Sequence, residues 1–516
     1  MQEILLEEIK KNPCSYKPYY EYAKYLEDIN LKQAYLTYEN ALYYCKDMYE
    51  KEQIQKKLDE IAYRNGKVEP ASIVILSYNN KDLTKQCIES IRETTPESAR
   101  EIVIVDNNSQ DDSVEYLRQQ SDIVLIENNF NAGFPGGCNI GIRASNPKND
   151  IFLLNNDTIL CANSLYTLRM GLYEKDNYGS AGAVSNNVVN GQQVIEDHLE
   201  IDTYKEFALQ TNIPCKDYEI KIVLIGFALL IKRNVLNQVG LLDERFNPGN
   251  YEDDDYGLRI LEKNYQNILI RNSFIIHLGG KSFISESRRK LMLENSLKLK
   301  TKYNFDAAKD TSYFLHSDFT VNFYENVLER IDDNKKVLDG TCDMGARLLH
   351  LAYKYPKLDF YGLDSNIQCA MISSHLEGVH ISHYFEIENN PFKDMKFDLI
   401  ALDTTKIKKS ELEVYLRILK GMLKPDGKLV VLTKNMSFYE NWYPVLSGEK
   451  RVMDTENVFN VDVDEAIRKL ELKPTNWLFY FPQIPDEVRK KLDLISKAVG
   501  EGKHVTVNQI AYTIVL

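Results

Sequence analysis

Four short apolar runs rich in β-branched residues follow one another between residues 72 and 154. They read SIVIL, EIVIV, DIVLI and IFLL, and the segments between them include the amphipathic stretches DLTKQCIESIRET and DSVEYLRQQ. Strands that alternate with helices in this way predict a parallel sheet that is covered on both faces. This alternation restricts the region to an α/β fold.

Each of the four runs ends in a stretch rich in Asn and Asp. In chain order these stretches are SYNN (77–80), DNNS (106–109), ENN (127–129) and NND (155–157). The carboxyl ends of parallel strands lie along one edge of an open sheet, and ligands bind at that edge. Asn and Asp are also common in turns and helix caps, but four such clusters on one edge favour a site for a polar ligand.

The glycine pattern excludes two familiar nucleotide sites. A dinucleotide site requires G-x-G-x-x-G directly after the first strand, and the sequence SYNNKD at that place has no glycine. A P-loop requires Gly-Lys followed by Ser or Thr, and the glycine-rich segment GFPGGCNIG (133–141) contains no lysine. The ligand is therefore not NAD or ATP bound in the usual manner.

Charge and composition further limit the binding partners and the cellular compartment that we expect. The net charge of −13, from 63 basic and 76 acidic residues, argues against a nucleic-acid partner or an anionic membrane surface. The longest apolar run, IVLIGFALLI (222–231), is too short to span a membrane, and the N-terminus lacks the pattern of a secretory signal. Eight cysteines without a CxxC pair fit a reducing compartment. We therefore expect a cytoplasmic protein without a transmembrane segment.

Eight motifs between about residues 70 and 300 occur in a recognisable order. They are SIVILSYNN, IVIVDNNSQDDS, NNFNAGFPGGCNIGI, IFLLNNDTIL, IGFALLIKR, VGLLDERF, YEDDDYGLRI and IIHLGGKS. Together they resemble the family 2 inverting glycosyltransferases of the GT-A fold, in particular the rhamnosyltransferase-like branch. The resemblance implies transfer of a sugar, such as the deoxyhexose rhamnose, from a nucleotide-diphosphate donor. The acceptor would be a hydroxyl of a bacterial-type surface glycan or glycoprotein.

The resemblance also implies which residues bind the donor. The nucleotide and sugar would be held by Ser77, Tyr78, Asn79, Asp106, Asn139 and Asn155. In NND, Asp157 occupies the place of the metal-binding aspartate of the family's D-x-D motif, and the first aspartate of that motif is replaced by asparagine. His277 of HLGGKS would be the second protein ligand of Mg²⁺ or Mn²⁺.

The acidic run EDDD (252–255) directly precedes an apolar, helix-like segment. The resemblance places the catalytic base at Asp253, with Asp255 as the second candidate and Glu252 as an acceptor-binding group. A helix N-terminus also tolerates such a run without any chemistry, because its backbone N–H groups stabilise negative charge. The later segment KSFISESRRK (281–290) is either a lid that contacts the diphosphate or a solvated basic face.

A second resemblance covers about residues 320–516. The segments VLDGTCDMGARLLHLAYKYP, LKPDGKLVV and QIAYTIVL resemble the class I methyltransferases that use S-adenosylmethionine. The resemblance implies that Asp339 and Gly345 contact this cofactor and that Asp364 binds its ribose. Thr341 and Asp343 stand where the family has glycines, and a Cβ obstructs a close backbone approach. The domain is therefore either an enzyme that O-methylates the transferred sugar or a non-catalytic relic.

These patterns predict a chain of four parts. They are an α-helical, tetratricopeptide-like hairpin (1–66), a GT-A nucleotide-diphospho-sugar transferase domain (67–303), a connecting helical segment (304–330) and a Rossmann-like methyltransferase domain (331–516). The hairpin either contacts a protein acceptor or caps the domain that follows it. An alternative from a different class is a scaffold or regulatory protein in which both Rossmann-like domains are degenerate and non-catalytic.

Overall fold

A computed structural model represents the 516-residue chain. The residues that it describes are 1–196, 198–279, 286–307, 327–328, 332–435, 457–480, 489–490, 492 and 507–515. Most of the predicted connecting segment and the first half of the predicted lid (281–290) lie outside these residues. Among the helices described, none is both long and apolar enough to cross a membrane.

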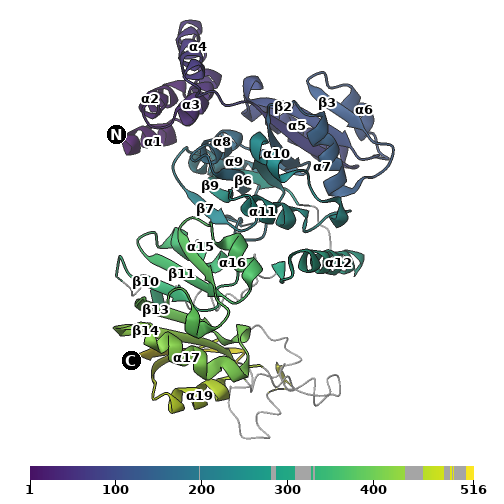
Figure 1. The fold of residues 1–516 in the computed structure, drawn as a ribbon. Helices are drawn as coiled ribbons and strands as arrows, with labels where there is room; N and C mark the ends of the chain where they lie inside the picture. The colour runs from purple at the N-terminus through teal and green to yellow at the C-terminus, as the bar shows by residue number, and fades with distance from the viewer. Residues whose placement is uncertain are drawn as a thin grey trace. The chain divides into compact units, whose positions relative to one another are not determined.

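The chain divides into two compact units, Met1–Tyr313 and Phe314–Leu516. Within the described residues, the first unit contains N-terminal helices and a nine-stranded sheet, and the second contains a seven-stranded sheet (Figure 1). These observations confirm the predicted α/β class with two sheets and N-terminal helices. The finer division into four parts stays a prediction.

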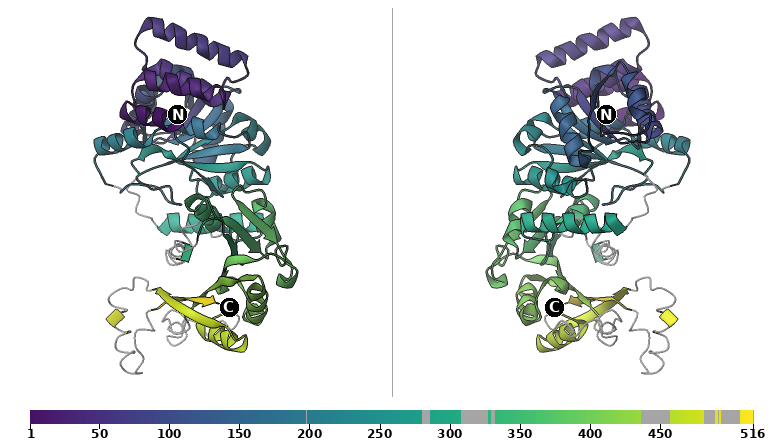
Figure 2. Two further views of the ribbon diagram at one scale, coloured as in Figure 1. Left: turned by 90° about the vertical axis from the view of Figure 1, so that its left-hand side faces the viewer. Right: turned by 90° about the vertical axis from the view of Figure 1, so that its right-hand side faces the viewer.

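The N-terminal region forms four helices. They are α1 (Gln2–Lys11), α2 (Tyr16–Leu26), α3 (Leu31–Tyr44) and α4 (Met48–Tyr63). The predicted hairpin is the α2–α3 pair, and the side chain of Asn30 caps α3 by accepting hydrogen bonds from two of its first backbone amides. Figure 2 shows these helices, in purple, gathered together at one side of the first unit.

Helix α3 packs against the sheet domain through α8 (Ser164–Leu172). Arg169 on α8 forms an ion pair with Glu39 on α3, and their side chains are 3% and 7% exposed. The Gln33 side chain donates to the Met170 carbonyl at 2.8 Å, which ties the same two helices. Much of the α3 surface is thus buried inside the first unit, as expected for a capping element.

The first sheet has nine strands in the described residues, and β1 to β4 follow the predicted alternation with helices. The nine strands are β1 (Ala71–Ser77), β2 (Arg100–Asp106), β3 (Ile123–Glu127), β4 (Asp150–Asn155), β5 (Thr158–Leu160), β6 (Tyr178–Val184), β7 (Tyr218–Lys221), β8 (Ala228–Ile231) and β9 (Gln266–His277). The order is β3-β2-β1-β4-β8-β6-β9-β5, with β7 paired to β9. Strands β1 to β4 are parallel neighbours, so their four polar endings lie along one edge, as predicted.

Helices cover this sheet. In addition to α8 they are α5 (Lys81–Thr94), α6 (Ser113–Arg118), α7 (Gly133–Ala144), α9 (Ile201–Thr211), α10 (Arg233–Val239) and α11 (Glu252–Glu262). A further helix, α12 (Glu286–Tyr303), contacts α11 and the loop before it. One apolar layer joins β1, β2 and β4 to α5 and α8, and another joins the opposite face to α7, α10 and α11.

The glycines of α7 have a packing role. A Cβ at Gly137 would lie 2.3 Å from the Leu76 side chain, and one at Gly141 would lie 2.4 Å from the Val74 side chain. Only glycine lets α7 approach β1 this closely. The glycine-rich segment that lacks a P-loop lysine is thus explained by contact between a helix and the sheet.

The described part of the second unit contains seven strands. They are β10 (Lys336–Asp339), β11 (Asp359–Asp364), β12 (Val379–His383), β13 (Phe397–Asp403), β14 (Leu423–Lys434), β15 (Lys473–Tyr480) and β16 (Gln509–Val515). Their order is β12-β11-β10-β13-β14-β16-β15, and β16 is antiparallel to both of its neighbours. The described helices of this unit are α15 (Ala346–Lys354), α16 (Ile367–Ser373), α17 (Leu412–Gly421) and α19 (Asn460–Lys469).

Candidate active site

The two predicted metal ligands lie next to each other. Strand β5, which begins just after Asp157, pairs with the end of β9, so that Thr158 lies opposite His277. The backbone amide of Leu278 donates to the Asp157 carbonyl at 2.9 Å. This pairing places the His277 Nε2 atom 3.3 Å from the Asp157 Oδ1 atom.

The orientation of the imidazole ring fits a metal ligand. The Nδ1 atom of His277 lies 2.7 Å from the Asn187 carbonyl oxygen, and because a carbonyl only accepts, Nδ1 carries a proton. Nε2 faces the Asp157 carboxylate at 3.3 Å, and this contact is favourable when Nε2 carries a proton or when a metal ion lies between the two atoms.

The described residues supply few ligands to such an ion. Among the described residues, no group of three or more His, Cys, Asp or Glu side chains has metal-binding geometry. A metal at Asp157 and His277 would therefore depend on further oxygen ligands from a bound substrate, as is usual for Mg²⁺ beside phosphates.

A two-residue segment, Gly226–Phe227, joins this pair to the predicted base. The Gly226 amide donates to Asp253 Oδ2 at 2.9 Å, and the Phe227 carbonyl accepts from the Asn155 amide at 2.9 Å. The Phe227 ring stacks on the His277 imidazole, with ring centroids 5.2 Å apart. The endings of β4 and β9 and the start of α11 thus converge on one short segment.

Burial sets the charge state of the first two acids of α11. Burial raises the pKa of Asp253, and the backbone amides of Gly226 and Asp254, which hydrogen-bond to the carboxylate, oppose this rise. Glu252 is 7% exposed, and burial followed by the neighbouring Asp253 charge raises its pKa well above the ordinary value. Its buried Oε2 atom has no hydrogen-bond partner among the described residues. A protonated Glu252 beside Asp253 is the arrangement that these surroundings favour.

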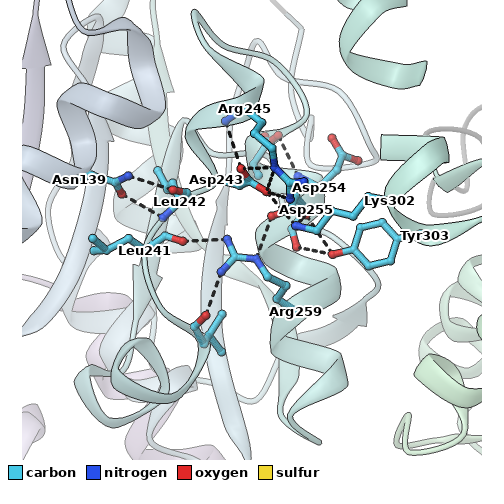
Figure 3. Close-up of polar contacts among 12 residues, drawn as sticks. Asn139, Leu241, Leu242, Asp243, Arg245, Asp254, Asp255, Arg259, Lys302 and Tyr303 are labelled. Carbon is cyan, nitrogen blue, oxygen red and sulfur yellow. Dashed lines mark hydrogen bonds and ion pairs between the residues drawn. The ribbon is translucent and has the colours of Figure 1, made fainter. Parts of the chain in front are cut away.

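Asp255 has a different environment (Figure 3). It is fully buried, and its carboxylate accepts from Arg259 Nε at 2.8 Å, from the Tyr303 hydroxyl at 3.0 Å and from Lys302 in a closer contact. The first partner lies on the same helix, four residues further along, where side chains are neighbours on the helix surface. The other two come from α12. Asp255 is thus held by two cations and a hydroxyl, which does not suit a proton acceptor.

The loop before α11, residues 246–251, is held from two sides. On one side, the buried Asn295 of α12 donates to three carbonyl oxygens of this loop, at 2.8, 3.0 and 3.1 Å. On the other side, the Phe134 amide of α7 donates to the Pro248 carbonyl at 2.8 Å. This double anchoring fixes the point at which α11 begins, and therefore the placement of its first acids.

The predicted nucleotide-binding residues of β1 and β2 lie together. The Asp106 carboxylate accepts from both the amide and the hydroxyl of Ser109, and that hydroxyl accepts from the Asn79 amide at 2.8 Å. Ser77 is buried against Thr84. The Tyr78 ring is 46% exposed at the edge of the sheet, where a flat base could stack on it.

Asn139 does not join this group. Its amide nitrogen donates to the Leu242 carbonyl and to Glu244, both at 2.9 Å, and its oxygen accepts from the Leu242 amide at 2.9 Å (Figure 3). The residue is 1% exposed. These contacts tie α7 to the loop around Leu242 and occupy its side chain within the protein.

One polar cluster of the site was missed by the sequence analysis. The stretch SNNVVN (185–190) follows β6 directly. The side-chain oxygen of Asn186 accepts from the His277 amide at 2.9 Å, and the Asn187 carbonyl orients the imidazole. The signal was available, because this stretch is a further Asn-rich ending of an apolar run.

The three predicted cofactor residues of the second unit lie around one loop. Asp339 ends β10, Gly345 precedes α15 with φ +82°, and Asp364 ends the neighbouring strand β11. A Cβ at Gly345 would lie 2.1 Å from the Ile381 side chain, so glycine is required there. Burial raises the pKa of Asp364 to about 6.

Residues 72–240 match the family model described as glycosyl transferase family 2. This region is therefore similar to the family 2 glycosyltransferases, and the match bears out the predicted enzyme class for it. The match includes the residues of the predicted donor edge and Asp157, and it ends before α11 and His277.

Two curated relatives are similar to parts of the chain. A poly(ribitol-phosphate) beta-glucosyltransferase of Bacillus spizizenii is 32% identical over 129 residues, which cover 24% of this chain and 20% of that protein. The low-salt glycan biosynthesis hexosyltransferase Agl10 of Haloferax volcanii is 28% identical over 194 residues, which cover 34% and 56%, respectively. The chain therefore spans less than two thirds of either relative.

Solved structures show only distant similarity. A mannosyltransferase from Pyrobaculum calidifontis, in complex with GDP-Man and Mn²⁺, aligns at 15% identity and a TM-score of 0.33, covering 42% of this chain and 59% of that one. A putative sarcosine dimethylglycine methyltransferase from Galdieria sulphuraria aligns at 12% identity and a TM-score of 0.28, covering 39% of this chain and 85% of that one. A geranyl diphosphate methyltransferase aligns at 11% identity and a TM-score of 0.29, covering 38% and 77%, respectively. Scores this low carry no argument about activity.

Proposed function

We propose that the first unit is an inverting glycosyltransferase that moves a sugar from a nucleotide-diphosphate donor to an acceptor hydroxyl. The observation that carries this proposal is the convergence of Asp157, His277 and Asp253 on the Gly226–Phe227 segment. One pair of side chains can face the diphosphate while a carboxylate faces the acceptor.

Asp253 acts as the base in this proposal. The acceptor oxygen forms a bond to the anomeric carbon, its proton passes to the Asp253 carboxylate, and the bond from that carbon to the diphosphate oxygen breaks. A positioned base contributes about 10²–10⁴-fold to such a reaction, most effectively when its pKa lies near the working pH. The raised pKa of Asp253 favours this role, and its contacts with two backbone amides hold the carboxylate in place.

Asp157 and His277 would hold Mg²⁺ or Mn²⁺. When bound, the metal supplies Lewis-acid stabilisation of the charge on the departing nucleoside diphosphate. The Asn187 carbonyl fixes the imidazole tautomer, and Phe227 fixes the ring plane. A mixed oxygen and nitrogen ligand set is compatible with either ion.

The other acids have supporting roles. Glu252 lies next to the base and, when protonated, can donate a hydrogen bond to the acceptor. Asp255 anchors α11 to α12 and is not the base. On the donor side, Tyr78 and Asp106 belong to the group proposed to bind the nucleotide, whereas Asn139 serves to hold α7 in place.

The finer features are part of the same proposal. A rhamnose-like donor sugar and an acceptor on a surface glycan or glycoprotein follow from the family resemblance, and the two curated relatives are named for glycosyl transfer to polymers or in glycan biosynthesis. The cytoplasmic location stays a prediction. Contact between the N-terminal helices and a protein acceptor is the less favoured reading, because α3 is packed against α8.

Hydrolysis and transfer assays with a panel of nucleotide sugars and Mn²⁺ test the proposal. The wild-type protein should consume one donor in a metal-dependent manner, and both Asp157→Ala and Asp253→Asn should reduce its consumption. Equal rates in all three proteins would instead support a scaffold without catalytic activity.

A further inference from the structure

The second sheet has one place where a ligand would be expected. Its strand order reverses at β10, which has β11 on one side and β13 on the other. Open parallel sheets bind ligands outside the carboxyl ends of the strands at this reversal. S-adenosylmethionine, which the methyltransferase resemblance implies, would lie there against the loop 339–345 and beside Asp364. Whether it fits depends on the side chains at this edge.

An ion pair between residues of the chain crosses that edge. Lys406 follows β13, and its Nζ atom lies 2.9 and 2.7 Å from the two carboxylate oxygens of Asp343, which follows β10. The two side chains are only 16% and 14% exposed. Since β10 and β13 are adjacent parallel strands, this pair bridges the two strands at the reversal.

The loop after β10 also lacks two of the glycines at which the family's backbone would contact the cofactor. Asp343 occupies a family glycine position and has φ +51°, a left-handed conformation that favours glycine. Thr341 occupies another, and its hydroxyl accepts from the Asp403 amide at 3.0 Å, which ties the loop to the end of β13. Side chains therefore stand where the cofactor would contact main chain.

The carboxylate of Asp339, the last residue of β10, is also engaged by other residues of the chain. Asp339 is paired with Arg347 of α15, and the two side chains are 1% and 4% exposed. The amide of Thr341 donates to the same carboxylate at 3.0 Å. The Asp364 carboxylate accepts from the Asn366 amide at 2.7 Å, within its own turn, and also interacts with the backbone of Asp343.

We infer that the Asp343–Lys406 pair closes this crevice and that the second unit does not bind S-adenosylmethionine. Opening the crevice would separate two largely buried opposite charges, which is unfavourable unless each finds a new partner. The residues present do not fit the cofactor, so the reading in which this unit O-methylates the transferred sugar is set aside.

Calorimetric titration of the full-length protein with S-adenosylmethionine and S-adenosylhomocysteine tests the inference, with thermal unfolding as a second readout. We expect no saturable heat and no shift in melting temperature at roughly millimolar ligand, a concentration at which a micromolar ligand stabilises clearly. The variant Thr341→Gly/Asp343→Gly/Lys406→Ala should gain binding of both ligands. Lys408→Ala, which changes an exposed lysine two residues away, should behave like the wild-type protein.

Two results would overturn the inference. The first is saturable binding by the wild-type chain with a micromolar Kd. The second is an absence of binding in the triple variant when its melting temperature shows that it is folded, because the named side chains would then not be the obstruction. Neither result depends on sugar transfer by the first unit, so this inference and the proposed function can fail separately.

Discussion

Replacing Asp255 and Asp253 separately by asparagine tests whether adjacent acids of α11 have different roles. The Asp255 carboxylate is fully buried and contacts Arg259, Lys302 and Tyr303. An asparagine in place of Asp255 would keep the shape of the side chain and remove its charge. Breaking a buried ion pair costs about 3–5 kcal/mol because it leaves unpaired charge behind.

The lower end of that range applies here. Lys302 keeps a second carboxylate, Asp243, at 3.0 Å, and Arg259 keeps hydrogen bonds to two carbonyl oxygens. We therefore expect Asp255→Asn to lower the free energy of unfolding by about 3 kcal/mol. At about 2 °C per kcal/mol for a large domain, the melting temperature of the first unit should fall by roughly 6 °C.

Asp253→Asn should instead reduce activity without reducing stability. The carboxylate of Asp253 is disfavoured by burial, so a neutral amide should leave the melting temperature unchanged or slightly raised. Donor consumption should fall about 10²–10⁴-fold because the base is lost. Differential scanning fluorimetry and the nucleotide-sugar assay measure the two effects, and Asp202→Asn, at an exposed acid of α9, is the control. The reasoning is refuted if Asp255→Asn keeps its melting temperature and loses activity while Asp253→Asn does the reverse.

Three further predictions concern the same site. His277→Ala should raise the Mn²⁺ concentration for half-maximal donor consumption at least about tenfold, measured by metal titration, because one of two protein ligands is lost; an unchanged titration would exclude His277 as a ligand. Glu252→Gln should stabilise the first unit increasingly as pH rises above the ordinary glutamate pKa, because the folded wild-type protein keeps its proton while the unfolded chain releases it; parallel melting-temperature profiles against pH would contradict this. Asn295→Ala should lower kcat more than it raises the donor KM, because it frees the loop that places the base; a pure KM effect would show that the loop serves donor binding.

The sequence predicted much of the first fold because its signals are local. Alternation of apolar and amphipathic segments identified β1 to β4, and their Asn-rich endings identified the edge of the sheet. The stretch after β6 was overlooked because it follows a run of small residues, YGSAGAV, rather than a β-branched one. In the second unit the short strand β12, VHISH, was not among the segments that carried the methyltransferase resemblance.

The roles of single polar residues could not be read from motifs alone. Asp255 stands in an acidic run at a helix start, and only the packing of α12 shows that Lys302 and Tyr303 neutralise it. Asn139 follows the glycines of α7, and only the fold shows that it faces the loop around Leu242. Such roles depend on partners that are distant in sequence, and no local spacing encodes them.

The ion pair between α3 and α8 has a practical consequence for anyone who shortens this protein. A truncation just before the first β-strand would be the obvious choice from the predicted domain boundary alone. It would, however, strip the counterion from Arg169 and uncover the ring of Tyr166, which lies beside it on α8. The shortened protein would expose an unpaired guanidinium on an apolar surface. The N-terminal helices should therefore be kept with the first sheet in any chimera.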